Sequence, residues 1–385
     1  MPVEAIASAA GTTTMEITVS KFELLRELTA TQGVVERKTT IPILSNYLFE
    51  AAGDKLSLTA TDLDLSLRTA CAVKVKKEGA CTIPARKLHD YVKLLPDADI
   101  TIKLLENHWV SIRCGRSNTK MVGMARANFP SLPAFPAAGV VKIPAQVLRA
   151  MIAKTGFAIA NEESRYTLNG ALMLLKPESI TMVATDGHRL AHIERSGAKF
   201  AGVSGEMKTL VPKKAMDELK SLLDATDVEE IEFAKDESTL YFRVGPRLLT
   251  SRQLTGQFPN FEAVLPKDNN KSVTLHGDEL AASISRVAQF ADERSRAVRL
   301  RLDKGELKLS ASSAETGESE DTIEIDYTGD AIAIGFNAQY LLDFLKATGS
   351  GEVKLEFKDA QSAGQLRPSE SEDYKYRYIV MPMRI

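Results

Sequence analysis

Three neighbouring residues in this sequence look able to do chemistry together. Asp186, His188 and Arg189 stand within four residues of one another around Gly187. A carboxylate, an imidazole and a guanidinium at this spacing suggest phosphoester hydrolysis. Such hydrolysis also needs a second carboxylate cluster or a set of metal ligands, and the sequence marks neither. It also lacks a Walker loop and a G-x-G-x-x-G loop. We therefore predict no catalytic residue and keep a hydrolase as the third of three hypotheses.

Cysteine and histidine are too scattered to suggest a metal centre. Cys71, Cys81 and Cys114 are odd in number and have no paired spacing. Among the histidines only His188 and His192 are close, and on a strand they would share a face without a carboxylate at ligand spacing. The sequence predicts no metal and no cofactor, and its cysteines indicate a reducing cytoplasm.

The same polar residues are better explained as a turn between two strands. The apolar run 180–184 ends at Thr185-Asp186-Gly187, where glycine can adopt positive φ. We expect the next strand at 188–193. Because neighbours on a strand alternate faces, Asp186 and Arg189 should not converge with His188. The C-terminal residues 378–385 are apolar except for Arg384, so something must cover them.

Length and composition indicate a soluble chain of two or three domains. The sequence has 385 residues, 44% hydrophobic and 26% charged, and no apolar run approaches the ~20 residues of a membrane helix. The net charge of −2 excludes an overall basic nucleic-acid binder. We interpret residues 1–14 as a flexible extension. The single tryptophan, Trp109, lies in an alternating strand and is most simply explained as a core residue.

One unit repeats three times. The segment beginning at Val19 recurs at Ile143 and Leu275, and 37 residues separate both Leu24 from Thr61 and Leu148 from Thr185. Between copies, Pro84 and Pro212 are 128 residues apart, and Phe129 and Phe258 are 129 apart. A period of this length is far longer than that of solenoid repeats, so the copies are whole domains. We predict three copies of one domain, at 15–136, 137–270 and 271–385.

Each copy combines two helices with several antiparallel strands. Segments such as 55–60 and 110–114 alternate apolar and polar residues, as half-buried strands do. Helical spacing predicts helices at 20–31, 85–95, 144–155, 213–223, 277–290 and 337–347. The fold class is therefore α+β, with three tandem copies.

The outward faces of corresponding helices carry positive charge in two copies. In the helix 85–95 these residues are Arg86 and Lys93, and in the helix 213–223 they are Lys213 and Lys220. A solvated face is the plain explanation, but the recurrence favours contacts with a phosphate backbone that carry no sequence information.

Four short segments, 165–170, 184–190, 335–337 and 381–384, resemble the bacterial sliding clamp, the β subunit of DNA polymerase III. The resemblance covers residues 15–385. It implies a head-to-tail homodimer forming a six-domain ring around double-stranded DNA, with the helices lining the hole. It also implies a non-catalytic processivity factor that binds the replicative polymerase, the clamp loader and other clamp-motif proteins, in the cytoplasm and on the nucleoid during replication. A non-ring DNA-binding or repair scaffold is the alternative hypothesis.

The resemblance also implies which residues carry these functions. The partner-peptide site would comprise Leu168, Thr185, Gly187, His188, Arg189, Leu190, Pro259, Val264, Asn337, Tyr340, Ile379, Met381, Pro382, Met383 and Arg384. DNA binding would fall to Lys38, Arg86, Arg165, Tyr166, Lys213 and Lys214, and the dimer interface to Thr119, Met121 and Phe290. Ala263, Ala363 and Lys38 depart from the residues common in the family, and lysine at position 38 offers a point charge where arginine would offer a fork.

Overall fold

One arrangement of helices and strands occurs three times along the chain. The computed structural model describes residues 14–384 apart from 37–38, 163, 198 and 371–372. Each copy runs strand, helix, four or five strands, helix and three strands. The six helices predicted from the sequence are confirmed, with ends within three residues of those expected.

The copies contain these elements. The first has β1 (Glu16–Ser20), α1 (Lys21–Ala30), β2 (Asn46–Ala52), β3 (Lys55–Thr61), β4 (Leu65–Ala72), β5 (Lys74–Lys77), β6 (Gly79–Pro84), α2 (Ala85–Leu94), β7 (Asp99–Leu104), β8 (Trp109–Cys114) and β9 (Ser117–Val122). The second has β10 (Val141–Pro144), α3 (Ala145–Thr155), β11 (Gly170–Lys176), β12 (Ser179–Thr185), β13 (Arg189–Ser196), β14 (Met207–Pro212), α4 (Lys213–Ala225), β15 (Glu230–Lys235), β16 (Thr239–Val244) and β17 (Arg247–Arg252). The third has β18 (Lys271–His276), α5 (Gly277–Val287), β19 (Ala297–Asp303), β20 (Glu306–Ser313), β21 (Gly317–Glu324), β22 (Ile332–Asn337), α6 (Ala338–Thr348), β23 (Glu352–Phe357), β24 (Gly364–Pro368) and β25 (Lys375–Val380).

The described residues form two compact units. The first extends to Gln146 and includes Asp217–Gln253, and the second holds Val147–Met216 and the chain from Leu254. The first unit contains a five-stranded sheet, β5-β1-β7-β8-β9, and an eight-stranded sheet, β10-β15-β16-β17-β4-β3-β2-β6. The second contains an eight-stranded sheet, β14-β11-β12-β13-β25-β24-β23-β18, and a four-stranded sheet, β21-β20-β19-β22.

Strand pairing joins consecutive copies within each unit. In the first unit β4 of the first copy pairs with β17 of the second, and in the second unit β13 of the second copy pairs with β25 of the third. Both pairings are antiparallel, so each eight-stranded sheet is continuous across two copies. We call these two places the first and the second junction.

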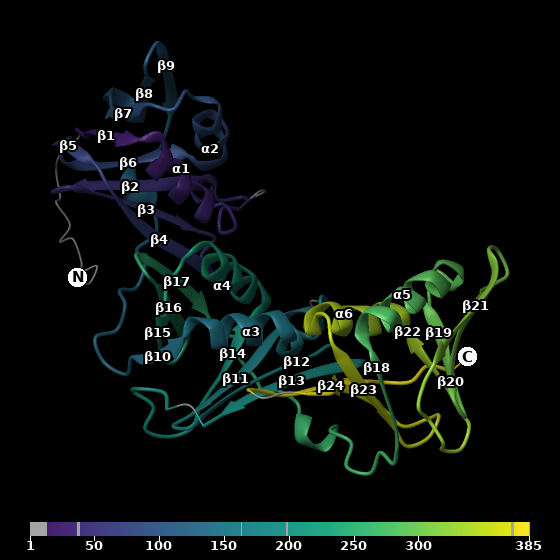
Figure 1. Ribbon diagram of the computed structural model, residues 1–385. Coiled ribbons are helices and arrows are strands. Elements are labelled where there is room, and N and C mark those ends of the chain that lie inside the picture. The colour runs from purple at the N-terminus through teal and green to yellow at the C-terminus, as the bar shows by residue number, and fades with distance from the viewer. Residues whose placement is uncertain (1–13, 37–38, 163, 198, 371–372, 385) are drawn as a thin grey trace. The chain divides into compact units, whose positions relative to one another are not determined.

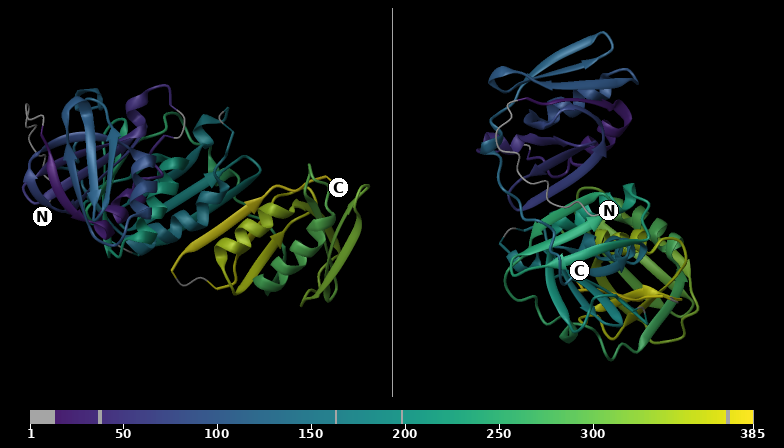
Figure 2. Two further views of the ribbon diagram at one scale, coloured as in Figure 1. Left: turned by 90° about the horizontal axis from the view of Figure 1, so that it is seen from above. Right: turned by 90° about the vertical axis from the view of Figure 1, so that its left-hand side faces the viewer.

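Local sequence explains where the helices begin. The Ser20 hydroxyl accepts a hydrogen bond from the Glu23 N–H at 3.2 Å and caps α1. Asn337 caps α6 in the same way through the Gln339 N–H, at 2.9 Å. Within their units α1 packs beside α2 and α5 beside α6 (Figures 1 and 2), and each helix turns its apolar stripe towards the strands.

The predicted strand alternation is confirmed, but the placement of Trp109 was wrong. In β8 Val110, Ile112 and Cys114 are buried, whereas Trp109 lies on the opposite face and is 42% exposed. An odd position in this strand belongs to the wet face, so the large ring ends there and not in the core. It borders a surface groove together with Leu104 and Leu105.

A buried ion pair locks the first junction. Glu27 on α1 is 1% exposed and Arg247 on β17 is 4% exposed. Arg247 donates to both carboxylate oxygens, Nε to Oε2 at 3.0 Å and Nη2 to Oε1 at 3.1 Å, while Thr69 and Arg26 donate to the same carboxylate. Burial would raise the pKa of Glu27, but these hydrogen bonds outweigh it and hold the pKa below its ordinary value. Two copies are thereby joined through a satisfied buried charge.

Arg247→Ala should lower the thermal unfolding midpoint strongly. The substitution leaves the Glu27 carboxylate buried without its main partner, which costs about 3–5 kcal/mol, or on the order of 10 °C for a unit of this size. Arg252→Ala on the same strand is the matched control, because its pair with Asp64 is exposed on both sides and is worth about 0–1 kcal/mol. Calorimetry that gave the two variants equal midpoints would show that the buried pair does not hold the junction.

Candidate partner-binding site

The turn between β12 and β13 is built by its own side chains. The Asp186 carboxylate oxygen Oδ1 accepts the His188 and Arg189 N–H groups at 2.9 and 3.1 Å, and the Thr185 hydroxyl donates to the Arg189 carbonyl at 2.6 Å. Gly187 has φ +89°, and a Cβ there would lie 2.5 Å from a guanidinium nitrogen of Arg165. The predicted Asp-Gly turn is therefore present, although β13 begins at Arg189, one residue later than expected.

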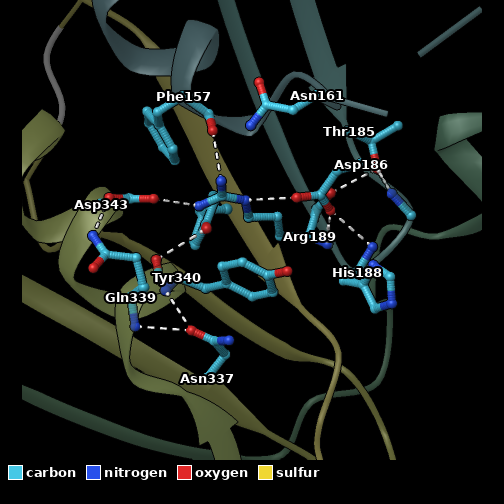
Figure 3. A network of polar contacts seen from close by, with 12 residues as sticks. Phe157, Asn161, Thr185, Asp186, His188, Arg189, Asn337, Gln339, Tyr340 and Asp343 are labelled. Atoms are coloured by element: carbon cyan, nitrogen blue, oxygen red, sulfur yellow. Dashed lines mark hydrogen bonds and ion pairs between the residues drawn. The ribbon is translucent and has the colours of Figure 1, made fainter. Parts of the chain in front are cut away.

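The Arg189 side chain is held from three sides on the helix-facing side of the sheet (Figure 3). Its Nε donates to Asp186 at 3.0 Å, Nη1 to Asp343 of α6 at 2.5 Å and Nη2 to the Phe157 carbonyl at 2.6 Å. The guanidinium carbon lies 4.3 Å from the centre of the Tyr340 ring, within the range of a cation–π contact. Asp186 and Arg189 thus pair with each other, while the His188 side chain is exposed, so no acid–base group is assembled with the histidine.

An apolar cluster lies on the other face of the same strands. Successive residues of β13 alternate faces, so Leu190 turns away from Arg189. Three predicted site residues, Leu168, Leu190 and Ile379, are buried in this cluster. The other buried members, which the sequence analysis missed, are Ala160, Leu172, Val183, Leu210 and Phe258. Strand alternation in 170–176 and 179–185 could have indicated Leu172 and Val183.

The C-terminal tail is tied to both copies at the second junction. The Met381 N–H donates to the His188 carbonyl at 2.9 Å, and the Met383 N–H donates to the Gly335 carbonyl at 2.8 Å. Met381 is nevertheless 45% exposed. Its side chain is therefore not part of a closed core.

The remaining predicted residues lie around these features. Pro259 and Val264 are exposed on either side of the short turn Phe261–Ala263, and Arg384 is exposed in the tail. Asn337 caps α6, and Tyr340 stacks on Arg189. Two residues that hold Arg189 were not expected, because Asp343 and Phe157 lie 154 and 32 residues away and carry no sequence signal.

The residues predicted to bind DNA are distributed over both units. Arg86 is exposed on α2 of the first unit. Within the second unit Arg165 and Tyr166 are exposed just before β11, and the Lys213 ammonium of α4 donates to Asn161 in the same segment. Arg165 also donates to the Asp186 carbonyl at 2.8 Å. Lys38 lies outside the described residues.

In the part of the chain that the structure describes, no three His, Cys, Asp or Glu side chains are placed to hold a metal ion. None of the described helices is long and apolar enough to cross a membrane.

Three copies of one two-helix, two-sheet domain, joined by strand pairing, define a DNA-clamp architecture. Residues 15–133, 142–260 and 262–384 match the N-terminal, central and C-terminal domains of the DNA polymerase III beta subunit. The chain belongs to this family, the beta sliding clamps, which are processivity factors of DNA polymerase.

Relatives and solved structures agree. The chain is 34% identical to the beta sliding clamp of Caulobacter vibrioides and 36% identical to that of Pseudomonas putida, in each case over 96% of this chain and 100% of the relative. It superposes on the sliding clamp of Pseudomonas aeruginosa bound to griselimycin with a TM-score of 0.89 at 34% identity, covering 96% and 100% of the two chains. For the clamp of Bartonella birtlesii bound to griselimycin the TM-score is 0.91 at 32% identity, covering 97% and 100%.

A buried histidine adjoins the apolar cluster. His192 is 8% exposed on β13, its ring centre lies 5.6 Å from that of Phe261, and its Nδ1 has no partner among the described residues. Burial lowers the pKa of His192, and Arg377 on β25 adds to this. Glu194 on its own strand and Glu262 in the turn 261–263 oppose the shift without cancelling it.

The pKa of His192 predicts a loss of stability in mild acid. The unfolded chain binds a proton at His192 near the ordinary pKa of 6.5, whereas burial lowers this pKa in the folded chain. The unfolded chain therefore binds the proton more readily, and stability falls as pH drops below that value. His192→Leu should reduce the difference in unfolding midpoint between pH 7.5 and 5.5. His276→Leu, at an exposed position, is the control and should keep the full difference; an unchanged slope in His192→Leu would contradict the assignment.

Proposed function

We propose that two copies of this chain assemble head to tail into a ring of six domains that encircles duplex DNA without reading its sequence. In this proposal the protein performs no chemistry, and it tethers the polymerase and other partners through short peptides. The domains are those predicted from the sequence, 15–136, 137–270 and 271–385. The proposal of a ring rests on one observation, which is the way in which consecutive copies pair their strands.

Each junction uses the same two strands of the repeat. The fourth strand of one copy pairs with the last strand of the next, as β4 does with β17 and β13 with β25. The fourth strand of the third copy is β21 and the last strand of the first copy is β9, and both lie at sheet edges. A partner subunit would offer each of these edges its missing neighbour, and closure through unlike ends needs such a heterologous contact.

The ladders give the equivalent residue in β21. In the third copy Gly335, two residues before the α6 cap, lies opposite Arg299, which lies opposite Ser310, which lies opposite Glu320. The same steps in the second copy lead from Leu210 to His192. Glu320 thus stands where His192 stands at the second junction.

The ladders also give the equivalent residue in β9. Thr18, two residues before the α1 cap, leads across Thr101 and Arg113 to Asn118. The same route in the third copy leads from Thr274 across Lys354 to Arg367. The next residue, Leu366, lies opposite Tyr378, so continuing this register by one step leads to Arg377, which pairs with His192. By this equivalence Glu320 should face Asn118 of the partner subunit, and two residues along Glu318 should face Lys120 of the partner subunit.

This register pairs opposite charges. The β21 strand carries Glu318, Glu320, Asp321 and Glu324, whereas Lys120 of β9 has Arg113 and Arg116 nearby in sequence. Opposite charges directly across an antiparallel pair stabilise it modestly. The predicted interface residues fit the same pairing, since Thr119 and Met121 lie on β9 and Phe290 lies in the turn 288–290 that packs on β20 and β21.

The peptide site would use the second junction. The apolar cluster there supplies a floor, exposed Met381, Pro259 and Val264 supply apolar rims, and flexible methionine suits several ligands. Partners would present a short segment with Gln and Leu or Phe. Arg86, Arg165, Tyr166, Lys213 and Lys214 would give weak, salt-sensitive contacts to phosphate, with Lys38 as a further expectation.

Cysteines placed by this register should cross-link the ring. Thr119→Cys and Ser319→Cys would face each other between subunits with Cα atoms about 4.5–5.5 Å apart, which suits a disulfide. Mild oxidation of the double variant should give covalent dimers on a non-reducing gel, with twice the 42.1 kDa chain mass. The native cysteines are all buried and should not interfere.

A shifted pair tests the register itself. Thr119→Cys with Glu320→Cys moves one thiol to the opposite face of its strand and should not cross-link. Cross-linking of both pairs alike would refute the register, and a monomer by light scattering at micromolar concentration would favour the non-ring scaffold.

Met381→Ser should weaken partner peptides about five- to tenfold, which is about 1 kcal/mol. The change removes an exposed apolar side chain but keeps the two backbone hydrogen bonds of the tail. Fluorescence anisotropy with a labelled Gln- and Leu/Phe-bearing peptide measures the effect. Leu94→Ser on α2, where the leucine is 85% exposed, is the control; equal affinities for all three proteins would remove Met381 from the site.

A further inference from the structure

Asp343 belongs to none of the four segments that carry the family resemblance, yet it lies at the second junction. It stands in the middle of α6 with 21% of its side chain exposed. Its Oδ2 accepts from Arg189 at 2.5 Å and its Oδ1 accepts from Gln339 at 2.8 Å. One carboxylate of the third copy therefore holds the arginine that begins β13 of the second copy.

The Arg189 guanidinium is engaged and enclosed within the protein. Each of its three guanidinium nitrogens already donates to an acceptor, on Asp186, Asp343 and Phe157. The Tyr340 and Phe157 rings lie 4.3 and 5.5 Å from the guanidinium carbon, and the side chain is only 10% exposed. Figure 3 shows the group enclosed by these residues. Its side chain therefore acts within the protein.

The backbone of Arg189 connects its side chain to the proposed peptide site. Its N–H donates to the Asp186 carboxylate and its carbonyl accepts from Thr185, so the turn depends on where Arg189 lies. The carbonyl of the preceding His188 accepts from the Met381 N–H. The C-terminal tail is therefore hydrogen-bonded to the same turn.

We propose that Asp343 is a positioning residue of the partner-peptide site: through Arg189 it fixes the turn 185–190, and through that turn it fixes the tail at Met381. The inference rests on the proposed peptide-binding function for its consequence, but the hydrogen bonds themselves can be tested without a peptide. Asp343 contacts no ligand in this proposal. From the helix side of the sheet, it sets the geometry of the turn 185–190 and of the tail at Met381.

Asp343→Asn in the full-length protein is the decisive change. It removes the charge, keeps the shape and leaves Arg189 its contacts with Asp186 and Phe157, so the chain should fold. Hydrogen exchange followed by mass spectrometry should show faster exchange in segments 186–190 and 381–383. Peptide affinity by anisotropy should fall about tenfold, in the range of couplings transmitted through contiguous contacts.

Three further variants separate positioning from general damage. Asp268→Asn removes an exposed carboxylate that pairs with Lys358 in the same unit, and it should change neither exchange nor affinity. Asp343→Glu keeps the charge and should restore most of the affinity. An Arg189→Lys background lacks the Nη1 group that donates to Asp343, so there the Asp343→Asn change should add little.

The outcomes distinguish the two proposals. Unchanged exchange in Asp343→Asn overturns the positioning role, and so does a full additional loss of affinity in the Arg189→Lys background. If the wild-type protein binds no peptide, the proposed pocket fails, while the exchange comparison still decides whether Asp343 holds the turn.

Discussion

Antiparallel pairing between the fourth strand of one copy and the last strand of the next is the constraint on which the rest depends. The free N–H and C=O groups of a strand edge can pair with a further strand. The repeat provides such a strand at β4–β17 and β13–β25. This pairing places side chains of two copies on one sheet face. Both the buried Glu27–Arg247 pair and the candidate peptide site are consequences of it.

Equivalent positions at the junctions carry different chemistry. At one equivalent position of the strand pairing, Ser66 lies opposite Thr250 at the first junction and Leu190 lies opposite Ile379 at the second. By the proposed register, Glu318 lies opposite Lys120 at the same position between subunits. Hydroxyl groups give a polar floor, aliphatic groups an apolar one, and opposite charges a strand contact that salt weakens. The same backbone arrangement can thus hold a chain together, receive a partner and close a ring.

Buried charge has a specific task at each intrachain junction. Arg247 is satisfied by Glu27 and Arg189 by Asp186 and Asp343. Such pairs add little net stability compared with apolar packing, but removing one partner is costly. They therefore favour one relative placement of the two strands that meet, and at the second junction they set the turn beside the apolar cluster.

Sequence alone determined the threefold repeat, the six helices and the turn at Gly187, because periodicity, caps and turn residues act between near neighbours along the chain. It placed Leu168, Leu190 and Ile379 in the site only by resemblance, and it put Trp109 on the wrong face because alternation does not say which face is wet. Asp343 had no sequence signal at all. It lies 154 residues from Arg189, as Glu27 lies 220 from Arg247. Only the strand pairing of the tertiary structure decided these contacts, since it alone brings such distant side chains within hydrogen-bond distance.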